Sequence, residues 1–386
     1  MPTDGPDVAV GPGASGRVLH VVESLGGGVL TSILSMVDAT PGLEHQLAIW
    51  RRREHAGAGD HHGDFARVHL LPGHPRRASR SLRGVVAEVR PDVVHAHSSY
   101  AGALVRVTGL SVRVAYSPHC FAFERRDLGT AGRAVFRELE RLLARRTDVL
   151  VACSPHEADL ALDLGHRRVV AVPNRALDPP GTRAAWAEPF TVVGVGRVAA
   201  QKDWRRFAAV KRQVDARGGA GLRWEWLGGG DPAGEDHLRA NGIEVSGWLP
   251  RAEATARLAA AQAYLHTAAW EGAPVSVLEA AAAGLPLAAR AIPALTGWGV
   301  PGVEPSVDGL ADRLVDLRDP ATWTAAQHGS LRFAAEHSAS VQRYRLGAAY
   351  EHVPASYRTG TRGPGAGRDQ IRRPADQSAD DAALVR

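Results

Sequence analysis

The feature that most restricts the fold of this chain is a repeated alternation of short apolar strands, glycine or proline turns and amphipathic helices. Arg17–Val22 is an apolar run that ends near a glycine turn and leads into a helical pattern. The same order recurs at four further places, residues 91–97, 112–116, 149–153 and 169–172. Strands that alternate with helices predict a mostly parallel sheet covered by helices on both faces, and we expect five strands in this half.

A second alternation follows a proline-rich stretch at 177–189, which we interpret as a linker. The alanine-rich helix that begins near Ser276 should end at Gly284, because glycine readily takes the left-handed conformation that closes a helix. Further apolar strands are expected at 190–194, 224–227, 243–245 and 263–267. Loops at the carboxyl ends of such strands are where open α/β domains bind their ligands.

We therefore expect an α/β protein of two Rossmann-like domains, whose parallel sheets face each other across a cleft. The expected segments are a disordered N-terminus at 1–16, a first domain at 17–176, the linker at 177–189, a second domain at 190–340, a helix at 341–358 that crosses back to the first domain, and a disordered tail at 359–386. On the first domain's side the cleft should hold Gly26 to Gly28, His97, His119 and Ser154.

Composition excludes several classes of protein. Cys120 and Cys153 are the only cysteines among 386 residues, so neither a disulfide scaffold nor a cysteine-rich metal module is expected. The net charge of +5 rests on arginine, since Lys202 and Lys211 are the only lysines, and no nucleic-acid partner is expected. No secretion signal and no apolar run of the roughly 20 residues that a membrane-spanning helix needs is evident, so we expect a cytoplasmic protein.

The segment Glu271–Glu279 combines two carboxylates with the start of a helix. A helix start leaves backbone N–H groups without partners, which suits a diphosphate. Ionised carboxylates only accept hydrogen bonds, so Glu271 and Glu279 are candidates for binding the hydroxyl groups of a sugar or ribose. The segment alone leaves open a surface glutamate in a loop and a solvated glutamate on a helix.

A second segment, Gly196–Lys202, follows the first strand of the second domain. Arg197 and Lys202 can together hold a pyrophosphate, because arginine offers a planar fork of donors and lysine a mobile charge. A solvated helix start is the alternative.

In this order the segments resemble the GT-B retaining glycosyltransferases of glycosyltransferase family four, which use nucleotide sugars. The resemblance runs from about Arg17 to Tyr350. It rests on Gly26–Gly28, Val94–His97, Ser117–His119, Val151–Ser154, Val172–Asn174, Gly196–Arg197 with Lys202, Gly228–Asp231, Gly247–Pro250 and Glu271–Ala280.

The resemblance implies that Arg197 and Lys202 bind the donor diphosphate, that Glu271 binds the donor sugar, and that His119 lies beside the reacting sugar. These four are the expected catalytic residues. It also implies donor contacts from Gly27, Gly28, Arg197, Lys202, Gly229, Leu249, Glu271, Ala273, Pro274, Val275, Ser276, Val277 and Glu279, with Glu279 on the ribose and Leu249 near the base.

The expected reaction moves a sugar to an acceptor hydroxyl with retention of the anomeric configuration. Because Arg197, Lys202 and a helix start can stabilise the leaving diphosphate, and no Asp-x-Asp motif is evident, no metal and no cofactor are expected. A UDP-sugar is favoured over a GDP-sugar, and the acceptor is expected in bacterial polysaccharide, glycolipid or secondary-metabolite synthesis. A nucleotide-sugar 2-epimerase and a catalytically silent GT-B partner protein are the alternatives.

The chain departs from the family pattern at three places. Val29 and Leu30 stand where an acidic residue is frequent, and Arg175 stands where glycine often follows Pro-Asn. Ala291–Trp298 replaces a glycine-rich loop. The first two departures bear on the acceptor rather than on the donor.

Two further patterns allow a structural interpretation. Six histidines and two aspartates between 45 and 74 predict a solvated loop rather than a metal site: His45, His55, Asp60, His61, His62, Asp64, His69 and His74. A helix at 131–146 should turn its apolar residues Val135, Leu139, Leu142 and Leu143 to the core and its arginines to solvent. Peripheral contact of that basic face with the inner side of a membrane is the alternative.

Overall fold

The computed structural model describes residues 16–23, 26–50, 62–177, 179, 181–219 and 221–351. No helix within these ranges is long and apolar enough to cross a membrane. The first sheet and its connections comprise β1 (Arg17–Val22), α1 (Gly27–Ala39), β2 (Glu44–Trp50), η1 (His62–Asp64), β3 (Arg67–Leu71), α2 (Pro75–Val89), β4 (Val93–His97), α3 (Ser99–Thr108), β5 (Arg113–Ser117), η2 (Ala122–Glu124), α4 (Thr130–Ala144), β6 (Val149–Ala152), α5 (Pro155–Asp163) and β7 (Val169–Ala171).

The second sheet and its connections follow along the chain, and two helices close the described part. They are β8 (Thr191–Val195), η3 (Ala200–Lys202), α6 (Trp204–Ala216), β9 (Arg223–Leu227), α7 (Pro232–Ala240), β10 (Glu244–Val245), α8 (Arg251–Ala260), β11 (Ala263–His266), α9 (Val275–Ala282), β12 (Leu287–Arg290), α10 (Pro293–Thr296), β13 (Val303–Glu304), α11 (Val307–Asp316), α12 (Pro320–Ala335) and α13 (Ala339–Tyr350).

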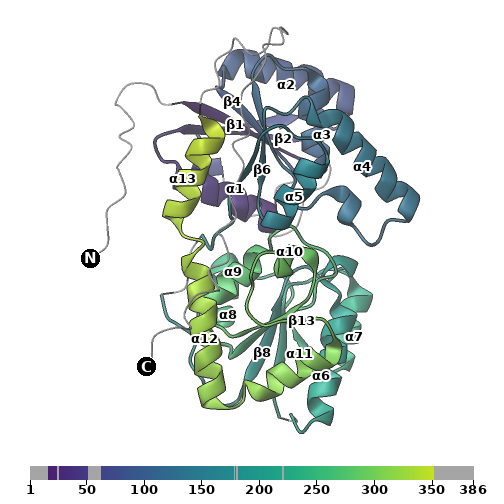
Figure 1. Cartoon of the computed structure of the whole chain (residues 1–386), viewed down its shortest axis with the longest axis vertical. Coiled ribbons are helices and arrows are strands. Elements are labelled where there is room, and N and C mark those ends of the chain that lie inside the picture. The colour runs from purple at the N-terminus through teal and green to yellow at the C-terminus, as the bar shows by residue number, and fades with distance from the viewer. Residues whose placement is uncertain are drawn as a thin grey trace, which may run out of the picture. The chain divides into compact units, whose positions relative to one another are not determined.

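Two parallel sheets with helices on both faces confirm the predicted α/β class (Figure 1). The strand order is β3-β2-β1-β4-β5-β6-β7 in the first sheet and β10-β9-β8-β11-β12-β13 in the second. In each sheet the order reverses beside a central strand, next to β1 in the first and next to β8 in the second. Ligand sites of open α/β sheets form at such reversals, so the loops after β1, β4, β8 and β11 are the ones placed to bind.

The first sheet has seven strands rather than the expected five, because the histidine-rich stretch supplies β2 and β3. His45 on β2 and His69 on β3 are buried, so the prediction of a solvated loop was wrong for both. Their ring nitrogens are satisfied inside the protein, His45 by His20 and His69 by Gln46. Of the remaining members of that stretch, His62 and Asp64 form η1, His74 is exposed before α2, and His55, Asp60 and His61 lie outside the described residues.

The second sheet likewise gains two strands, β12 and β13, that were not predicted. The predicted helix stop at Gly284 is confirmed, since this residue has φ 77° directly after α9 and its cap. Trp226, Phe207 and Phe190 are buried in the core of this half.

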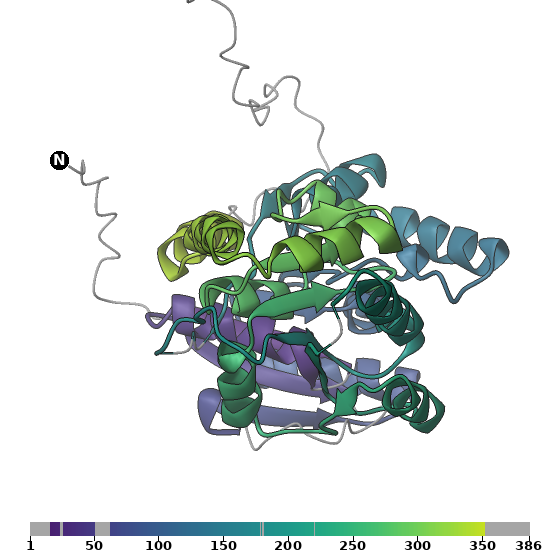
Figure 2. The same cartoon turned by 90° about the horizontal axis from the view of Figure 1, so that it is seen from below.

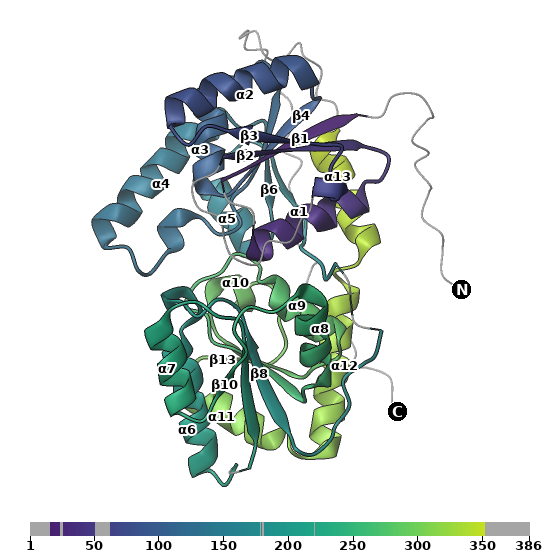
Figure 3. The same ribbon diagram turned by 180° about the vertical axis from the view of Figure 1, so that it is seen from behind.

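The last helix, α13, packs on the first sheet, although it follows the second sheet along the chain. Leu346, Ala349 and Tyr350 of α13 share a core cluster with Val18 and Val93. In Figures 1 and 3, α12 and α13 lie on the same side of the molecule. The chain thus returns to the first sheet through α13.

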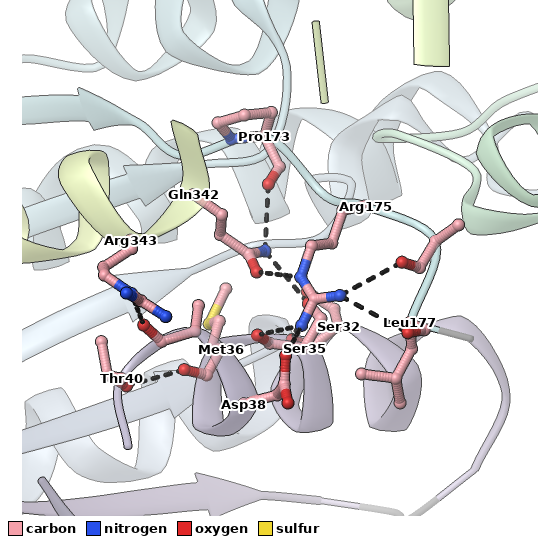
Figure 4. Close-up of polar contacts among 12 residues, drawn as sticks. Ser32, Ser35, Met36, Asp38, Thr40, Pro173, Arg175, Leu177, Gln342 and Arg343 are labelled. Carbon is pink, nitrogen blue, oxygen red and sulfur yellow. Dashed lines mark hydrogen bonds and ion pairs between the residues drawn. The ribbon is translucent and has the colours of Figure 1, made fainter. Parts of the chain in front are cut away.

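Arg175 fastens the segment after β7 to α1 and α13. Its guanidinium donates from Nε to Gln342 Oε1 over 3.1 Å and forms an ion pair with Asp38 of α1 (Figure 4). Gln342 in turn donates from Nε2 to Ser35 Oγ over 3.0 Å and to the Pro173 carbonyl over 3.1 Å. This buried network holds Arg175 between two helices, so the residue that replaces the frequent glycine makes structural contacts.

The orientation of α4 also differs from the prediction. Val135, Leu139 and Leu142 are 69%, 38% and 72% exposed, while Leu143 is buried as expected. Glu140 faces inward instead, because its carboxylate accepts from Tyr116 Oη over 2.9 Å and forms an ion pair with the buried Arg106. A buried ion pair between helices therefore decides which face of α4 points to the sheet. Figures 2 and 3 show α4 at the side of the first sheet, away from the strands.

Candidate active site

The loops that follow β8 and β11 bring Lys202 and Glu271 into contact. Lys202 Nζ lies 2.5 Å from Glu271 Oε1, and Gln201 Nε2 donates to Glu271 Oε2 over 3.2 Å. The paired side chains are only 19% and 11% exposed. The Ala269 amide donates to the Gln201 carbonyl over 2.8 Å, so the two loops are also joined through their backbones. The structure thus brings two of the predicted site residues, Lys202 and Glu271, into contact. Sequence reasoning missed Gln201 as a further member of the site, although it directly precedes Lys202.

Two helix starts lie next to each other close to this pair. Helix α1 begins at Gly27 and α9 at Val275, and neither start has a side-chain cap. A Cβ on Gly28 would lie 3.9 Å from Val275 Cγ2, so the two starts are neighbours (Figure 3). Unpartnered N–H groups give each start partial positive charge, and together they suit a diphosphate.

Asn174 joins α1 to the segment in front of α9. Its Oδ1 accepts from Ser32 Oγ over 2.7 Å, and its Nδ2 donates to the Ala273 carbonyl over 2.9 Å. Asn174 is 3% exposed. The Pro-Asn motif therefore sets the spacing of the two helix starts.

Glu279, expected at the ribose, lies on α9 and is paired with an arginine. Its Oε1 is 3.1 Å from one terminal nitrogen of Arg251, and the other terminal nitrogen donates to Thr31 Oγ1 of α1 over 3.1 Å. Sequence reasoning missed Arg251, although it is the first residue of α8, directly after the motif Gly247–Pro250. Arg251 thus links α1 to α8 and α9.

The glycine loop after β9 lies against the loop after β8. Val198 donates to the Gly229 carbonyl over 3.0 Å, and a Cβ on Gly230 would lie 3.0 Å from Arg197 Cγ. Arg197 is exposed beside this loop. Leu249 is half-buried, and its neighbour Trp248 is 51% exposed and would lie 3.4 Å from a Cβ on Gly229. Trp248 therefore presents an aromatic ring beside this glycine loop, whereas Leu249 packs against the core.

His119 belongs to the first half of the protein and lies next to the loop that carries Glu271. A Cβ on Gly272 would lie only 2.9 Å from the His119 carbonyl carbon and 2.6 Å from the Cys120 nitrogen. His119 and Cys120 have φ angles of 53° and 93°, a left-handed backbone that side chains rarely adopt. Burial lowers the pKa of His119 to about 4, so its ring is neutral at pH 7.

Two expected cleft residues of the first sheet have structural contacts. His97 is fully buried, and its ring contacts His20 and His119. Ser154 is the N-cap of α5, where its Oγ accepts from the Glu157 amide over 3.3 Å.

The residues at the helix start after Glu271 are buried or half-buried. The side chain of Val277 is fully buried, and its amide donates to the Pro274 carbonyl over 3.1 Å, so its predicted contact with the donor stays a prediction. Ser276 Oγ accepts from Tyr264 Oη over 2.8 Å. Val275 remains at the helix start that faces α1.

A cavity of about 530 Å³ opens beside Glu271 and Trp270. Arginine side chains of the first half line it, with Arg133 donating to the Phe123 carbonyl over 2.8 Å. His156 Nε2 donates to Glu124 Oε1 over 2.7 Å, and this hydrogen bond raises the pKa of that histidine. The remaining lining residues include Arg126, Arg137, Leu160, Ile292 and Pro293. This cavity is therefore cationic and adjoins the carboxylate of the Lys202–Glu271 pair.

Within the described ranges, one group of potential metal ligands comes together, namely His20, His95 and His97, whose ligand atoms lie within 4.8 Å of one another. His95 already hydrogen-bonds to Tyr350 Oη over 2.8 Å and to Ser117 Oγ over 2.9 Å. His20 and His97 bond to each other over 2.9 Å. The rings are thus held in a hydrogen-bond network whose nitrogens already have partners.

Two family models match the chain, one described as a glycosyl transferase 4-like domain at residues 27–175 and one as glycosyl transferases group 1 at residues 189–328. The chain is 26% identical over 247 residues to a 41.2 kDa protein from the cps region of Klebsiella pneumoniae, a match that covers 59% of this chain and 66% of that protein. It is 29% identical over 291 residues to 2-deoxystreptamine N-acetyl-D-glucosaminyltransferase of Streptomyces fradiae, with 65% of each chain covered. The matches span just under two thirds of the length of these curated relatives.

Solved structures share the fold at low sequence identity. Sucrose-phosphate synthase from Thermosynechococcus elongatus has a TM-score of 0.72 at 14% identity, covering 87% of this chain and 98% of that one. HepE of Anabaena in complex with UDP-glucose has a TM-score of 0.69 at 13% identity, covering 86% and 99%. These similarities establish a GT-B architecture.

Proposed function

The chain belongs to the glycosyltransferases that join a glycosyl transferase 4-like domain to a group 1 domain, and we propose that it transfers a sugar from a nucleotide sugar to an acceptor hydroxyl. One observation carries the proposal: two adjacent helix starts, at Gly27 and Val275, lie with the Lys202–Glu271 pair at the carboxyl ends of both sheets. The helix starts and Lys202 attract a diphosphate, and the Glu271 carboxylate accepts hydrogen bonds from sugar hydroxyls.

In the proposed reaction the bond between the anomeric carbon and the diphosphate oxygen breaks, and the electron pair stays on the diphosphate. Arg197, Lys202 and the helix starts stabilise that growing negative charge, which is the main catalytic contribution in this scheme. The Lys202 ammonium has three N–H groups and uses one on Glu271, so two can reach phosphate oxygens. The chain's own cations thus supply the charge for a metal-independent transfer.

Retention follows if the acceptor hydroxyl attacks from the face that the diphosphate leaves. The acceptor oxygen then bonds to the anomeric carbon, and its proton passes to the departing diphosphate oxygen. Such a step needs no protein base, which agrees with the neutral His119 as a group that positions the sugar.

A UDP-sugar is the proposed donor, with a GDP-sugar as the competitor to be tested. The solved HepE complexes hold UDP or UDP-glucose, which supports a uridine nucleotide in a site of this architecture. In this proposal the base lies near Leu249 and the exposed Trp248, and Glu279 receives the ribose.

The proposed acceptor site is the cationic cavity beside Glu271. Arg126, Arg133 and Arg137 line it, so it favours an acceptor with a carboxylate or phosphate near the reacting hydroxyl. The relatives from a cps region and from 2-deoxystreptamine glycosylation support polysaccharide or secondary-metabolite synthesis. The exposed apolar residues of α4, flanked by Arg141 and Arg145, support peripheral membrane contact from the cytoplasmic side.

Two variants test the site. Lys202→Ala and Glu271→Gln should abolish transfer from a UDP-sugar while the chain stays folded. Lys211→Ala is the matched control, because it removes the only other lysine, whose Nζ is 2.7 Å from Asp215 on the same helix. Normal transfer by either site variant would refute the role assigned to that residue. Thermal-shift titration with UDP, GDP and ADP identifies the base, since a bound nucleotide stabilises the folded state in proportion to its affinity.

Product analysis separates the alternatives. A nucleotide-sugar 2-epimerase would convert the donor without an acceptor, and a silent GT-B partner would bind nucleotide without turnover. Transfer of sugar to an added hydroxyl acceptor excludes both.

A further inference from the structure

Four histidine rings form a continuous hydrogen-bonded chain across the first sheet. His45 Nδ1 lies 3.0 Å from His20 Nε2, His20 Nδ1 lies 2.9 Å from His97 Nε2, and His97 Nδ1 lies 2.9 Å from His119 Nε2. Successive ring centroids are 5.2 Å apart. The residues come from β2, β1, the end of β4 and the loop after β5, which are neighbours in that order. This histidine chain therefore runs from the interior to the cleft residue His119.

Thr40 fixes the direction of this chain at its inner end. The Thr40 hydroxyl donates its only hydrogen to the Met36 carbonyl over 2.7 Å, so toward His45 it can only accept. His45 Nε2 lies 3.0 Å from that oxygen and 3.3 Å from the Thr40 carbonyl oxygen, which also only accepts. Both contacts require a hydrogen on His45 Nε2.

Neutral rings pass this requirement along the chain. Burial lowers the pKa of His20, His45, His97 and His119, so each ring carries one hydrogen and one lone pair at pH 7. With hydrogen on Nε2, His45 accepts at Nδ1 and obliges His20 to donate from Nε2. The same step repeats at His97 and then at His119. His119 consequently carries its hydrogen on Nε2 and a lone pair on Nδ1.

The backbone around His119 is held rigidly next to the Glu271 loop. The Cys120 and Cys153 amides donate to the two carboxylate oxygens of Glu157 over 2.7 and 2.8 Å. Gly272 packs directly on the left-handed backbone of His119 and Cys120. The ring orientation set by the histidine chain is thus presented at the edge of the proposed donor site.

We propose that Thr40, His45, His20 and His97 are positioning residues that hold His119 as the Nε2–H tautomer, so that His119 Nδ1 accepts a hydrogen bond from a substrate hydroxyl. A lone pair favours a sugar hydroxyl there and disfavours a phosphate oxygen, since phosphate oxygens only accept. The identity of the hydroxyl rests on the proposed function, whereas the tautomer does not depend on turnover.

Nitrogen-15 NMR of imidazole-labelled protein measures the tautomer directly, and His119→Asn assigns the signals. We expect protonated Nε2 and unprotonated Nδ1 for His119 in the unmodified full chain at pH 7. The opposite tautomer in that sample would overturn the proposal, and this measurement needs no variant to fold other than the one used for assignment.

His45→Phe should reverse the direction of the hydrogen bonds in the histidine chain. In this variant His20 Nε2 has no acceptor, so a hydrogen on Nδ1, where it can be donated to His97 Nε2, becomes the favoured tautomer of His20. His97 and His119 then change to the Nδ1–H tautomer in the same way. We expect His119 to become the Nδ1–H form and kcat/KM for the UDP-sugar to fall about tenfold, the size of one lost hydrogen bond. The matched control is His69→Phe on the adjacent β3, because His69 bonds to Gln46 and lies outside the chain.

The outcomes separate the two proposals. An inverted tautomer with an unchanged rate would overturn the positioning role, as would an equal loss of rate in His69→Phe. The expected tautomers in a protein that transfers no sugar from UDP-sugar or GDP-sugar would support the histidine chain and refute the proposed function alone.

Discussion

Gly272→Ala is the substitution for which the structure gives the clearest magnitude. The new Cβ would lie 2.6 Å from the Cys120 nitrogen, whereas ordinary contact begins at 3.4 Å, so atoms must separate by about 0.8 Å. The His119–Cys120 backbone cannot yield easily, because both carboxylate oxygens of Glu157 hold that region. The shift therefore falls on the loop that carries Glu271.

Overpacking of this kind costs about 1–3 kcal/mol of the free energy of unfolding, and a misplacement near 1 Å costs about 100-fold in rate. We expect Gly272→Ala to lose about two orders of magnitude in kcat/KM and to unfold at lower denaturant concentration. Gly132→Ala in α4 is the control, since its Cβ would meet nothing nearer than 3.9 Å and helical alanine is more favourable than glycine. Wild-type kcat/KM in Gly272→Ala would refute the placement of His119 against the Glu271 loop.

Three further outcomes are expected. Arg251→Ala removes the ion pair with Glu279 and the hydrogen bond to Thr31, so Glu279 loses a partner that orients it and the donor KM should rise about tenfold in initial-rate assays, while Lys211→Ala leaves it unchanged. Burial lowers the pKa of His95 to about 3, so below about pH 6.5 the unfolded state binds a proton that the folded state excludes. Urea titrations should therefore show that this residue lowers the free energy of unfolding by about 2 kcal/mol at pH 5 relative to pH 7. A free energy of unfolding that is the same at pH 7 and pH 5 would contradict the neutral buried rings. Leu142→Glu should reduce sedimentation with vesicles that contain anionic lipid, and equal binding by this variant would remove α4 from the proposed membrane contact.

The strand ends and their ligand-facing loops could be predicted because their signals are local. An apolar run followed by glycine marks the end of a parallel strand, and all such ends meet at one edge of a sheet. Lys202 and Glu271 are 69 residues apart, yet both follow predicted strands, and the structure places them 2.5 Å apart. Gly284 was predictable for the same reason, since its left-handed φ is a property of one residue and its helix.

The sequence was a poorer guide to which face of a helix or strand points inward. The periodicity of α4 contains two faces with apolar residues, and the sequence offers no reason to bury Glu140 rather than Leu142. Glu140 is buried because Arg106 and Tyr116, on α3 and β5, need its carboxylate. Charged residues that pair across elements can therefore reverse an assignment based on hydrophobic periodicity.

The histidine chain depends on a still less local property, the order of strands across the sheet. His45 and His69 belong to segments whose polar residues hide the alternation of a strand, and this is why β2 and β3 were not predicted. Once β2 lies beside β1, and β1 beside β4, each ring has a neighbour at hydrogen-bond distance and burying it costs little. Polar residues that resemble a solvated loop in the sequence can thus form an interior network when each of several neighbouring strands contributes one. In the proposed histidine chain, Thr40 sets the tautomer of His119 through three intervening rings.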